Sequence, residues 1–342
     1  MNNPDYHFVH PHFRLNGFHL SEDDLCRIAY SFIKEGEPFE RAVGDFILDW
    51  FDKNSYIEMQ TSGTTGAPKL IRVEKQAMVN SAIATGEFFD LASGIKVLHC
   101  LPTQYVAGKM MLVRAFILGW DLDLVAPASN PLERNETEYD FAAMVPLQAE
   151  HSLGRLHMIK KLILGGAKVS QALSEKLSGL STKIYETYGM TETITHIAAK
   201  RIGEEAFTVL PNVNISKDER NCLVIDPYEI CDEPVVTNDV VDIADDFHFI
   251  WLGRHDNVIN SGGVKLFPEQ IEEKLSGRIN RRFYVKGITD EVLGEKLVLV
   301  VEGEPFDIDK AVFKGLGKFE KPKEVQFVEK FEETGSGKVI RN

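Results

Sequence analysis

Residues 61–69 hold the most informative stretch of the chain, Thr61-Ser62-Gly63-Thr64-Thr65-Gly66-Ala67-Pro68-Lys69. The two glycines permit positive φ angles and a close approach of backbone to a ligand. The hydroxyls and backbone N–H groups can donate to phosphate oxygens, and Lys69 adds a cation. We therefore predict a phosphate-binding loop, with a plain surface hairpin as the alternative.

The residues beside this loop favour strands. A Walker A loop has the pattern GxxxxGK[ST] and opens a helix. Here Ser55–Gln60 precede the loop and Leu70–Glu74 follow it, and both segments have strand-like patterns. The expected structure is a flexible phosphate-binding loop between two strands.

The rest of the chain predicts an α/β fold. Ser21 and Asp24 form a weak capping box before a helix, and a second helix is expected over Phe39–Phe51. Beyond them, short strand-like runs alternate with helical stretches, which is typical of layered α/β proteins with buried sheets. The runs are Ser55–Gln60, Lys96–Leu101, Leu122–Ala126, Leu162–Leu164, Lys183–Glu186 and Cys222–Ile225.

A domain boundary is expected at Gly253–Asp256. A strand-like run, Phe247–Leu252, precedes it, and a Gly-Gly loop and a helix near Pro268 follow. The residues from 254 to 342 carry no net charge, so the formal charge of −14 lies within residues 1–253. We predict a large N-terminal domain (1–253) and a small, mobile α+β domain (254–342).

Composition excludes several classes of protein. The chain has 342 residues, 44% hydrophobic and 26% charged, as in ordinary globular proteins. No apolar run reaches the ~20 residues of a membrane helix. The N-terminal residues lack the basic and apolar regions of a secretory signal, so a cytoplasmic location is expected. The charge of −14 argues against binding to nucleic acids or anionic membranes.

The cysteines and histidines give weaker signals. No pair among Cys26, Cys100, Cys222 and Cys231 has CxxC spacing, so reduced core thiols are expected. His7, His10, His12 and His19 cluster near the N-terminus. A metal site is one interpretation of that cluster, and a solvated terminal segment is the preferred one.

Two further segments carry groups suited to nucleotide chemistry. Tyr185–Thr193 offers a Tyr188 ring for stacking on a base, Thr191 for a phosphate and Glu192 as an oxygen ligand for Mg²⁺. Thr334-Gly335-Ser336-Gly337-Lys338 places a lysine on a flexible tip, where it suits charge neutralisation in nucleotidyl transfer. A core tyrosine at a turn and a frayed terminus are the respective alternatives.

Together these segments resemble the adenylate-forming superfamily, which includes acyl-CoA synthetases, peptide-synthetase adenylation domains and luciferases. Both the motifs and their order agree, from about residue 55 to the end. After the Thr61–Lys69 loop, the matching segments are Leu101–Gly108, Gly165–Ala167, Tyr188–Glu192, Thr237–Asp239, Gly253–Asp256, Ser261–Gly263 and Lys338.

The resemblance implies ATP, Mg²⁺ and coenzyme A as cosubstrates and cofactor, with a carboxylic acid as substrate. Lys338, Thr191 and Glu192 would be the catalytic residues, with Glu192 holding the metal. Asp239 would accept hydrogen bonds from the ribose, supported by Arg254. The implied nucleotide-binding residues are Thr61, Ser62, Gly63, Thr64, Thr65, Gly66, Lys69, Gly165, Gly166, Ala167, Glu186, Tyr188, Gly189, Asp239 and Arg254.

The family performs two half-reactions with one active site. A carboxylate is first adenylated, and a thiol then displaces AMP. The resemblance implies that the small domain rotates between them about a hinge at Asp256. The rotation would remove Lys338 and bring in a thiol-tunnel loop at Ser261, Gly262 and Gly263.

Three departures from the family pattern are visible. Asn238 replaces a glycine of the ribose motif, and Tyr105 replaces a histidine of the substrate segment. The Gly-Glu motif that normally precedes the ribose motif is not visible around Asn221–Pro227.

Only 60 residues precede Thr61, far fewer than in most members of the family. In this compactness the chain resembles the short bacterial o-succinylbenzoate–CoA ligases of menaquinone biosynthesis. An acyl pocket is then expected at Gln104, Tyr105 and Lys109, and the segment Leu101–Arg114 also brings Arg114 near its start. A cation or a water-mediated site there would suit a second carboxylate. For Lys109 and Arg114, an exposed helix face is an equal alternative.

Three rival functions stay open: another aryl- or alkyl-CoA ligase, a carrier-protein adenylation enzyme and a non-catalytic nucleotide-binding relative. The intact Lys69, Glu192, Asp239 and Lys338 argue against the last of these. A basic cluster in the small domain is either a site for the 3′-phosphate of coenzyme A or a solvated face, and consists of Arg278, Arg281, Arg282 and Lys286.

Overall fold

A computed structural model describes residues 3–60, 70–231, 233–333 and 339–341. The first half alternates helices and strands. Its elements are β1 (Arg14–Leu15), β2 (Phe18–His19), α1 (Glu22–Glu35), α2 (Pro38–Trp50), β3 (Tyr56–Gln60), β4 (Leu70–Glu74), α3 (Lys75–Phe88), β5 (Lys96–His99), α4 (Val106–Leu118), β6 (Asp121–Leu124), β7 (Tyr139–Met144), α5 (Pro146–His151), η1 (Leu153–Met158), β8 (Ile159–Leu164) and α6 (Gln171–Ser178).

The second half is richer in strands. Its elements are β9 (Lys183–Gly189), η2 (Thr191–Thr193), β10 (His196–Arg201), β11 (Phe207–Val209), β12 (Asn214–Lys217), β13 (Cys222–Asp226), β14 (Val235–Asp245), β15 (His248–Arg254), η3 (His255–Asn257), β16 (Ile259–Ser261), β17 (Val264–Leu266), α7 (Pro268–Leu275), β18 (Phe283–Asp290), β19 (Gly294–Glu302), η4 (Lys310–Phe313) and β20 (Glu324–Val328).

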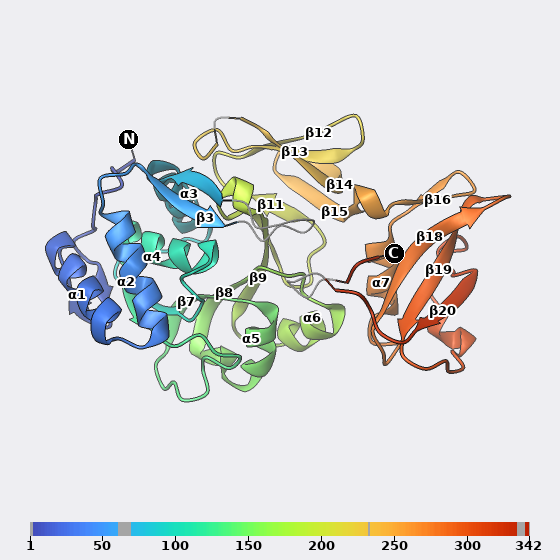
Figure 1. Cartoon of the computed structure of the whole chain (residues 1–342), viewed down its shortest axis with the longest axis horizontal. Coiled ribbons are helices and arrows are strands. Elements are labelled where there is room, and N and C mark those ends of the chain that lie inside the picture. Colours follow the sequence, from blue (N-terminus) through green and yellow to red (C-terminus); the bar gives the residue numbers. More distant parts are fainter. Residues whose placement is uncertain (1–2, 61–69, 232, 334–338, 342) are drawn as a thin grey trace.

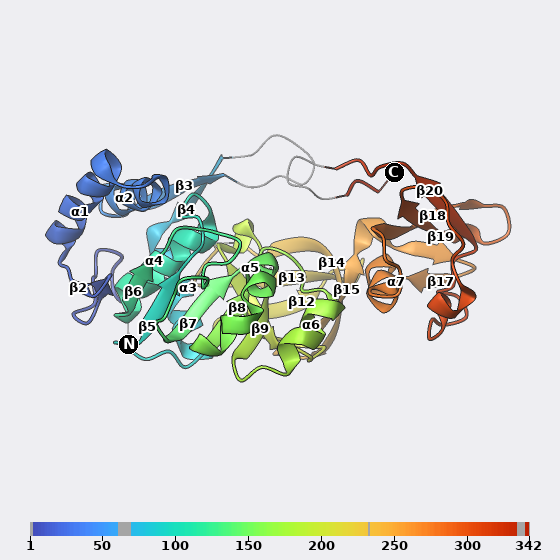
Figure 2. The ribbon, with the colours of Figure 1, turned by 90° about the horizontal axis from the view of Figure 1, so that it is seen from below.

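Parallel strands form the centre of the larger sheet, with helices on both faces. β6, β5, β7, β8 and β9 lie side by side in that order, and all their pairings are parallel (Figure 2). Alternate residues face opposite layers, as the period of a strand requires. Phe141 and Ile163 pack in one core with α1–α4, whereas Ala142 and Leu162 pack in another with α5 and α6. The predicted layered α/β fold is confirmed.

An antiparallel half continues the same sheet. Across the described residues its order is β12-β13-β14-β15-β11-β10-β9, and every neighbouring pair there is antiparallel. Its core is largely aliphatic, and within it Phe207 and Phe249 stack with ring centroids 5.4 Å apart.

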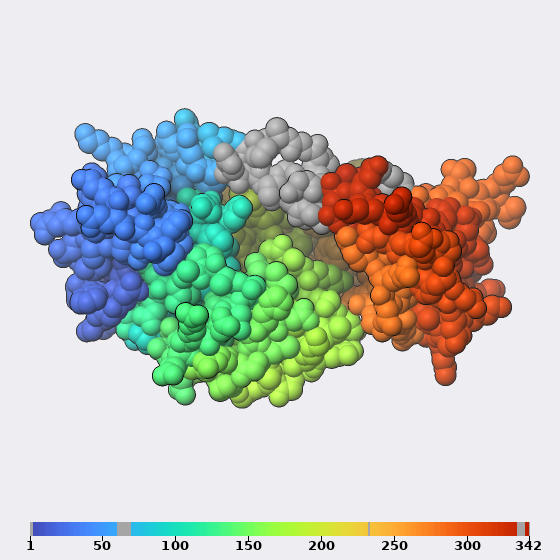
Figure 3. Space-filling view, turned by 60° about the horizontal axis from the view of Figure 1, so that its bottom comes forward, coloured from blue at the N-terminus to red at the C-terminus, as the bar shows by residue number. Residues whose placement is uncertain are grey.

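A second sheet holds the strands after the expected boundary. Along the chain, β15 is the last strand of the first sheet and stops at Arg254. β16 is the first strand of a second sheet, which consists of β17, β16, β19, β18 and β20 and packs beside α7. Figure 1 shows β18–β20 at the opposite end of the molecule from α1 and α2, and Figure 3 shows the residues after 254, in orange and red, gathered at that end. Whether the two parts move as separate domains remains a prediction.

Local sequence signals were accurate near the N-terminus. The hydroxyl of Ser21 accepts from the backbone N–H of Asp24, and the Asp24 carboxylate accepts from Ser21 in return, as the capping box predicts. The second helix spans Pro38–Trp50, one residue earlier than expected at each end. α7 begins at Pro268, as expected.

The strands beside the predicted phosphate loop form a separate antiparallel pair. β3 and β4 pair from Tyr56↔Glu74 to Gln60↔Leu70. The loop itself, Thr61–Lys69, and the tip carrying Lys338 lie outside the described residues. The two predicted strands beside the loop are therefore confirmed, and the predicted structure of the loop itself stays a prediction.

The expectation of core thiols holds in part. Cys100 and Cys222 are buried, whereas Cys26 and Cys231 are only half-buried. In the part of the chain that is described, no three His, Cys, Asp or Glu side chains gather to hold a metal ion. Nor does any helix there have the length and apolar character needed to cross a bilayer.

Gly189 permits a close backbone crossing at the end of β9. A Cβ built there would lie 2.3 Å from the carbonyl oxygen of Thr195 and 2.5 Å from the Cα of His196. Both neighbours are backbone atoms, so they cannot yield without separating β9 from β10. The glycine therefore fixes how closely these two strands meet at the carboxyl end of the parallel strands.

We expect Gly189→Ala to destabilise the protein by about 2 kcal/mol, because overpacking against backbone costs roughly 1–3 kcal/mol. The midpoint of urea denaturation measures the change. Gly179→Ala is the matched control, since a Cβ there meets nothing within 4 Å and φ is −87°. Equal midpoints for the two variants would contradict the assignment.

Candidate active site

Two cavities meet at the carboxyl ends of the parallel strands. Cavity A, of about 730 Å³, is lined by the ends of β7, β8 and β9, by η2 and by residues 235–239 of β14. Cavity B, of about 710 Å³, lies beside residues 166–169 and α7. Tyr188, Gly189 and Asp239 line both cavities. Open α/β sheets bind ligands at this edge.

The carboxylate of Asp239 is held from two strands. One oxygen accepts from the Tyr188 hydroxyl at 2.7 Å, and the other accepts from the Trp251 indole N–H at 3.1 Å. Arg254 approaches the second oxygen at 3.7 Å. Asp239 is only 6% exposed, so these partners offset the cost of burying its charge.

The Tyr188 hydroxyl is a fixed donor. Burial, together with the neighbouring charge of Asp239, raises its pKa well above the usual range, so it stays protonated. Its ring packs edge-on against Phe249, with centroids 5.3 Å apart, and is tilted against Phe207. The bond to Asp239 was not predicted, and the role of the ring in stacking on adenine stays a prediction.

Glu186 holds the glycine loop in place. Its side chain is buried, accepts from the backbone N–H of Val169 at 3.1 Å and lies 3.4 Å from the ammonium of Lys200. The loop at Gly165–Ala167 is thereby tied to β9. Gly166 has a φ of +79° and is exposed with Ala167 at the edge of the cavities. Glu186 lines cavity B while serving this structural role.

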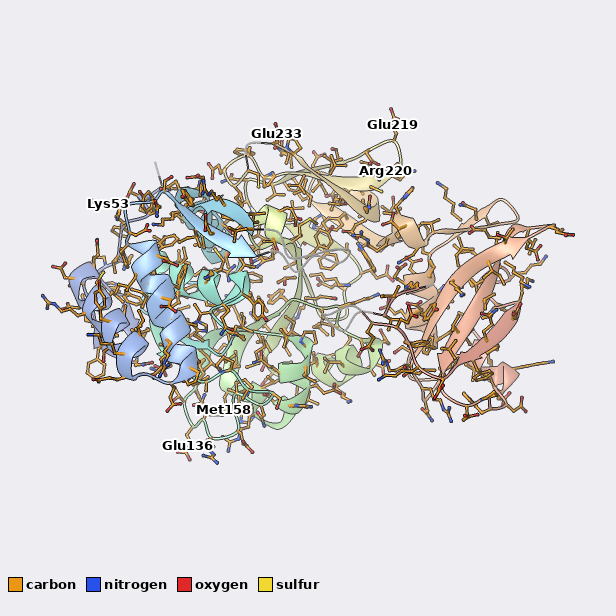
Figure 4. All side chains as sticks on the ribbon, in the orientation of Figure 1. Lys53, Glu136, Met158, Glu219, Arg220 and Glu233 are labelled. Carbon is orange, nitrogen blue, oxygen red and sulfur yellow. The ribbon has the colours of Figure 1, made fainter. Side chains whose placement is uncertain are left out.

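Asn238, which departs from the family motif, has specific partners. Its side-chain oxygen accepts from Arg220 at 2.8 Å, and its amide donates to Asp256 at 3.2 Å. Figure 4 labels Arg220 on the turn after β12, beside β14, with Glu219 pointing outward from that turn. Asp256, the predicted hinge, also lies 3.5 Å from Arg254. A glycine at 238 would lack both side-chain contacts.

Arg114 of α4 is a buried cation on the wall of cavity A. It is 2% exposed, and one Nη lies 3.4 Å from the Thr195 hydroxyl and 3.5 Å from His196 Nδ1. Its Nε has no hydrogen-bond partner, and in the described part of the chain its Nη atoms contact Met111, Thr195 and His196 but no carboxylate. Burial lowers its pKa to about 9, so the guanidinium remains charged at neutral pH. An uncompensated buried charge is costly, so this wall favours an anionic ligand.

The predicted acyl-pocket residues lie elsewhere. Gln104 lines a separate cavity of about 240 Å³ beside α2, and Tyr105 is 64% exposed. The ammonium of Lys109 lies over the Phe46 ring, 5.0 Å from its centroid. None of the three lines cavity A.

The helical period explains why Arg114 lines cavity A and Lys109 does not. Ala107 and Arg114 are two turns apart on the α4 face that lines cavity A, whereas Lys109 is on the face toward α2. The exposed-face alternative therefore does not describe Arg114. Counting along α4 from Ala107 would have selected Arg114, but only once the cavity-facing side was known.

The remaining predicted site residues fall into two groups. Thr191 and Glu192 line cavity A, where Glu192 is exposed and its backbone carbonyl accepts from the Cys231 thiol at 3.1 Å. Ser261 ends β16, and Gly262 and Gly263 form the turn to β17; none of the three lines either cavity.

The chain on both sides of the Lys338 tip is anchored. Glu333 forms an isolated bridge with Val339. Arg341 donates to both Glu272 oxygens, at 2.7 and 2.8 Å, and so ties the end of the chain to α7. These contacts hold Glu333, Val339 and Arg341, on either side of residues 334–338.

Three arginines of the predicted coenzyme A cluster have partners within the fold. Arg278 donates to the Lys314 carbonyl, Arg281 donates to the Glu304 carbonyl at 3.0 Å, and Arg282 pairs with Glu302 and Glu333. These contacts favour a structural role over a phosphate site.

The fold and the two cavities define an α/β protein with ligand-sized cavities at the ends of its parallel strands. A model of the AMP-binding enzyme family matches residues 52–231, more than half of the chain. The chain therefore belongs to the AMP-binding enzyme family. The predicted resemblance to adenylate-forming enzymes is confirmed.

Solved structures share this fold. An acyl-CoA synthetase (AMP-forming)/AMP-acid ligase II-like protein from Dyadobacter fermentans is 35% identical, with a TM-score of 0.64, over 92% of this chain and 95% of that one. The o-succinylbenzoate coenzyme A synthetase of Bacillus subtilis, in complex with ATP and magnesium, has a TM-score of 0.70 at 19% identity, over 82% of this chain and 68% of that one.

A curated relative gives a more specific name. The 2-succinylbenzoate–CoA ligase of Staphylococcus aureus is 27% identical over an alignment of 326 positions that covers 83% of this chain. The chain spans 65% of that relative's length.

We expect Asp239→Asn to weaken AMP binding at least tenfold, because a hydrogen bond to a charged acceptor contributes about 1.5–3 kcal/mol. Isothermal titration calorimetry with AMP measures the loss. Asp242→Asn, at an exposed position of the same strand, is the control and should bind normally. Unchanged affinity in Asp239→Asn would contradict a nucleotide contact.

Proposed function

We propose that the chain is an ATP-dependent acid–thiol ligase that adenylates a carboxylic acid carrying a second carboxylate, and then transfers the acyl group to coenzyme A. The favoured acid is o-succinylbenzoate. Family membership supports the reaction, and the unpaired guanidinium of Arg114 in cavity A supports the second carboxylate.

In the first half-reaction, a carboxylate oxygen attacks the α-phosphorus of ATP. The bond between the α- and β-phosphates breaks, and pyrophosphate leaves with its electron pair. Thr61–Lys69 would hold the leaving phosphates, Thr191 the α-phosphate and Asp239 the ribose hydroxyls. Lys338 would neutralise charge between the two reactants.

The residues present fit a Mg²⁺ ion bound chiefly by the nucleotide. Mg²⁺ commonly keeps several waters and takes one or two carboxylates with substrate phosphates. Glu192, exposed at cavity A, supplies such a carboxylate. The bound ion would offset charge on the phosphates.

In the second half-reaction, the thiolate of coenzyme A attacks the acyl carbonyl, and AMP leaves. Lys338 has no role once the adenylate exists. We propose that residues 254–342 then rotate about Asp256, and that the Ser261–Gly263 turn approaches the site. The change of sheet between Arg254 and Ile259 supports a boundary there.

The second carboxylate would bind at Arg114. A guanidinium presents a planar fork of donors that matches a carboxylate, and its Nε is unused. Removal from water strengthens the attraction between opposite charges. A ligand carboxylate at this wall would compensate a buried charge that the described residues leave unpaired.

A pyrophosphate-release panel, with and without coenzyme A, tests this function. We expect turnover of o-succinylbenzoate, and at least 100-fold lower kcat/KM for 3-benzoylpropionate and 2-butanoylbenzoate, each of which lacks one carboxylate. Simple benzoates and fatty acids are further arms. Turnover of a simple acid without turnover of o-succinylbenzoate would exclude o-succinylbenzoate as the substrate. Pyrophosphate release that does not depend on coenzyme A would favour a carrier-protein adenylation enzyme.

Arg114→Met should lower the ratio of kcat/KM for o-succinylbenzoate to that for the better single-carboxylate analogue by about 100-fold. Methionine keeps much of the length of the side chain and removes its charge. Lys109→Met, on the other face of α4, is the matched control and should keep the ratio. Equal ratios in wild type and Arg114→Met would place the second carboxylate elsewhere.

Lys338→Ala should lower adenylation more than 100-fold, while thioester formation from supplied acyl-adenylate stays within about threefold. Each half-reaction is measured separately, by pyrophosphate release and by AMP release. Lys330→Ala, an exposed lysine nearby, is the control. Equal losses in both half-reactions would refute two arrangements of the small domain.

A further inference from the structure

His196 lies between Arg114 and helix α3. It begins β10 and is 6% exposed, while Thr85 of α3 is fully buried. His196 Nε2 lies 3.4 Å from the Thr85 hydroxyl oxygen, and Nδ1 lies 3.5 Å from an Nη of Arg114. The imidazole thus links a helix behind the sheet to the buried cation of cavity A.

The hydrogen bond of Thr85 fixes which nitrogen carries the proton. The Thr85 hydroxyl donates its single proton to the carbonyl oxygen of Ser81 at 2.9 Å. Toward His196 the oxygen can therefore only accept, so Nε2 must be the protonated nitrogen. Nδ1 then presents a lone pair to Arg114, which has donors and no acceptor.

The imidazole stays neutral in this position. Burial, reinforced by the charge of Arg114, holds the pKa of His196 well below its usual value. A protonated ring would also place a second cation beside a guanidinium that already lacks a carboxylate. The neutral Nε2–H form is the tautomer that satisfies both neighbours.

We propose that His196, with its tautomer set by Thr85 and Ser81, is a positioning residue that aims Arg114 into cavity A and thereby sets the preference for acids with a second carboxylate. The inference rests on the proposed function. His196, which begins β10, and Thr195 just before it hold one Nη of the guanidinium, while the buried Nε has no hydrogen-bond partner. Without them, the long side chain would have more rotamers, and holding it for a ligand would cost entropy.

Selectivity kinetics test the role. His196→Leu should lower the kcat/KM ratio of o-succinylbenzoate to its better single-carboxylate analogue at least tenfold, mainly through KM, with the KM for ATP within threefold. His196→Asn, which keeps an acceptor near Nδ1, should recover most of the ratio. Thr85→Val should lower it less than His196→Leu. A purely structural role would lower turnover of both acids alike and leave the ratio unchanged.

A measurement without substrate separates this inference from the proposed function. The ¹⁵N chemical shifts of the imidazole should show His196 protonated on Nε2 at neutral pH, and Thr85→Val should alter that pattern. Protonation on Nδ1, or on both nitrogens, would overturn the proposed role of His196, whatever acid the enzyme uses. If the wild type turned over none of the acids tested, the proposed function would fail. The imidazole spectrum would still decide whether Thr85 sets the tautomer of His196.

Discussion

The carboxylate of Asp239 imposes the strongest geometric constraint on the site. It accepts from Tyr188 on β9, although β15, β11 and β10 lie between β9 and β14 in the sheet. In a flat sheet, four spacings of about 4.8 Å would separate these strands by about 19 Å. The 2.7 Å bond therefore requires the antiparallel half to curl strongly, and that curl brings both cavities to the ends of the parallel strands.

Two buried charges of opposite sign face cavity A, and they differ in how they are compensated. Asp239 has Tyr188, Trp251 and Arg254 as partners, so its position is fixed before any ligand arrives. Arg114 has only neutral contacts, with Nε unused. A preorganised acceptor suits the invariant part of a substrate, and an uncompensated cation suits the part that distinguishes one acid from another.

Local signals predicted much of the fold, because they depend on neighbours in sequence. The Ser21 cap, the helix at Pro268 and the strands around the Thr61–Lys69 loop follow from such patterns. The burial of Arg114 and the exposure of Tyr105 could not be predicted, because they depend on which face of α4 meets β10 and which meets α2. The bond between Tyr188 and Asp239 likewise depends on curvature that joins residues far apart in sequence.

A crystal structure with a non-hydrolysable acyl-adenylate analogue of o-succinylbenzoate tests the central claim most directly. We expect the ribose hydroxyls on Asp239, and the free carboxylate of the acyl group within hydrogen-bond distance of the Arg114 guanidinium. A free carboxylate in solvent, or adenosine bound away from Asp239, would contradict it.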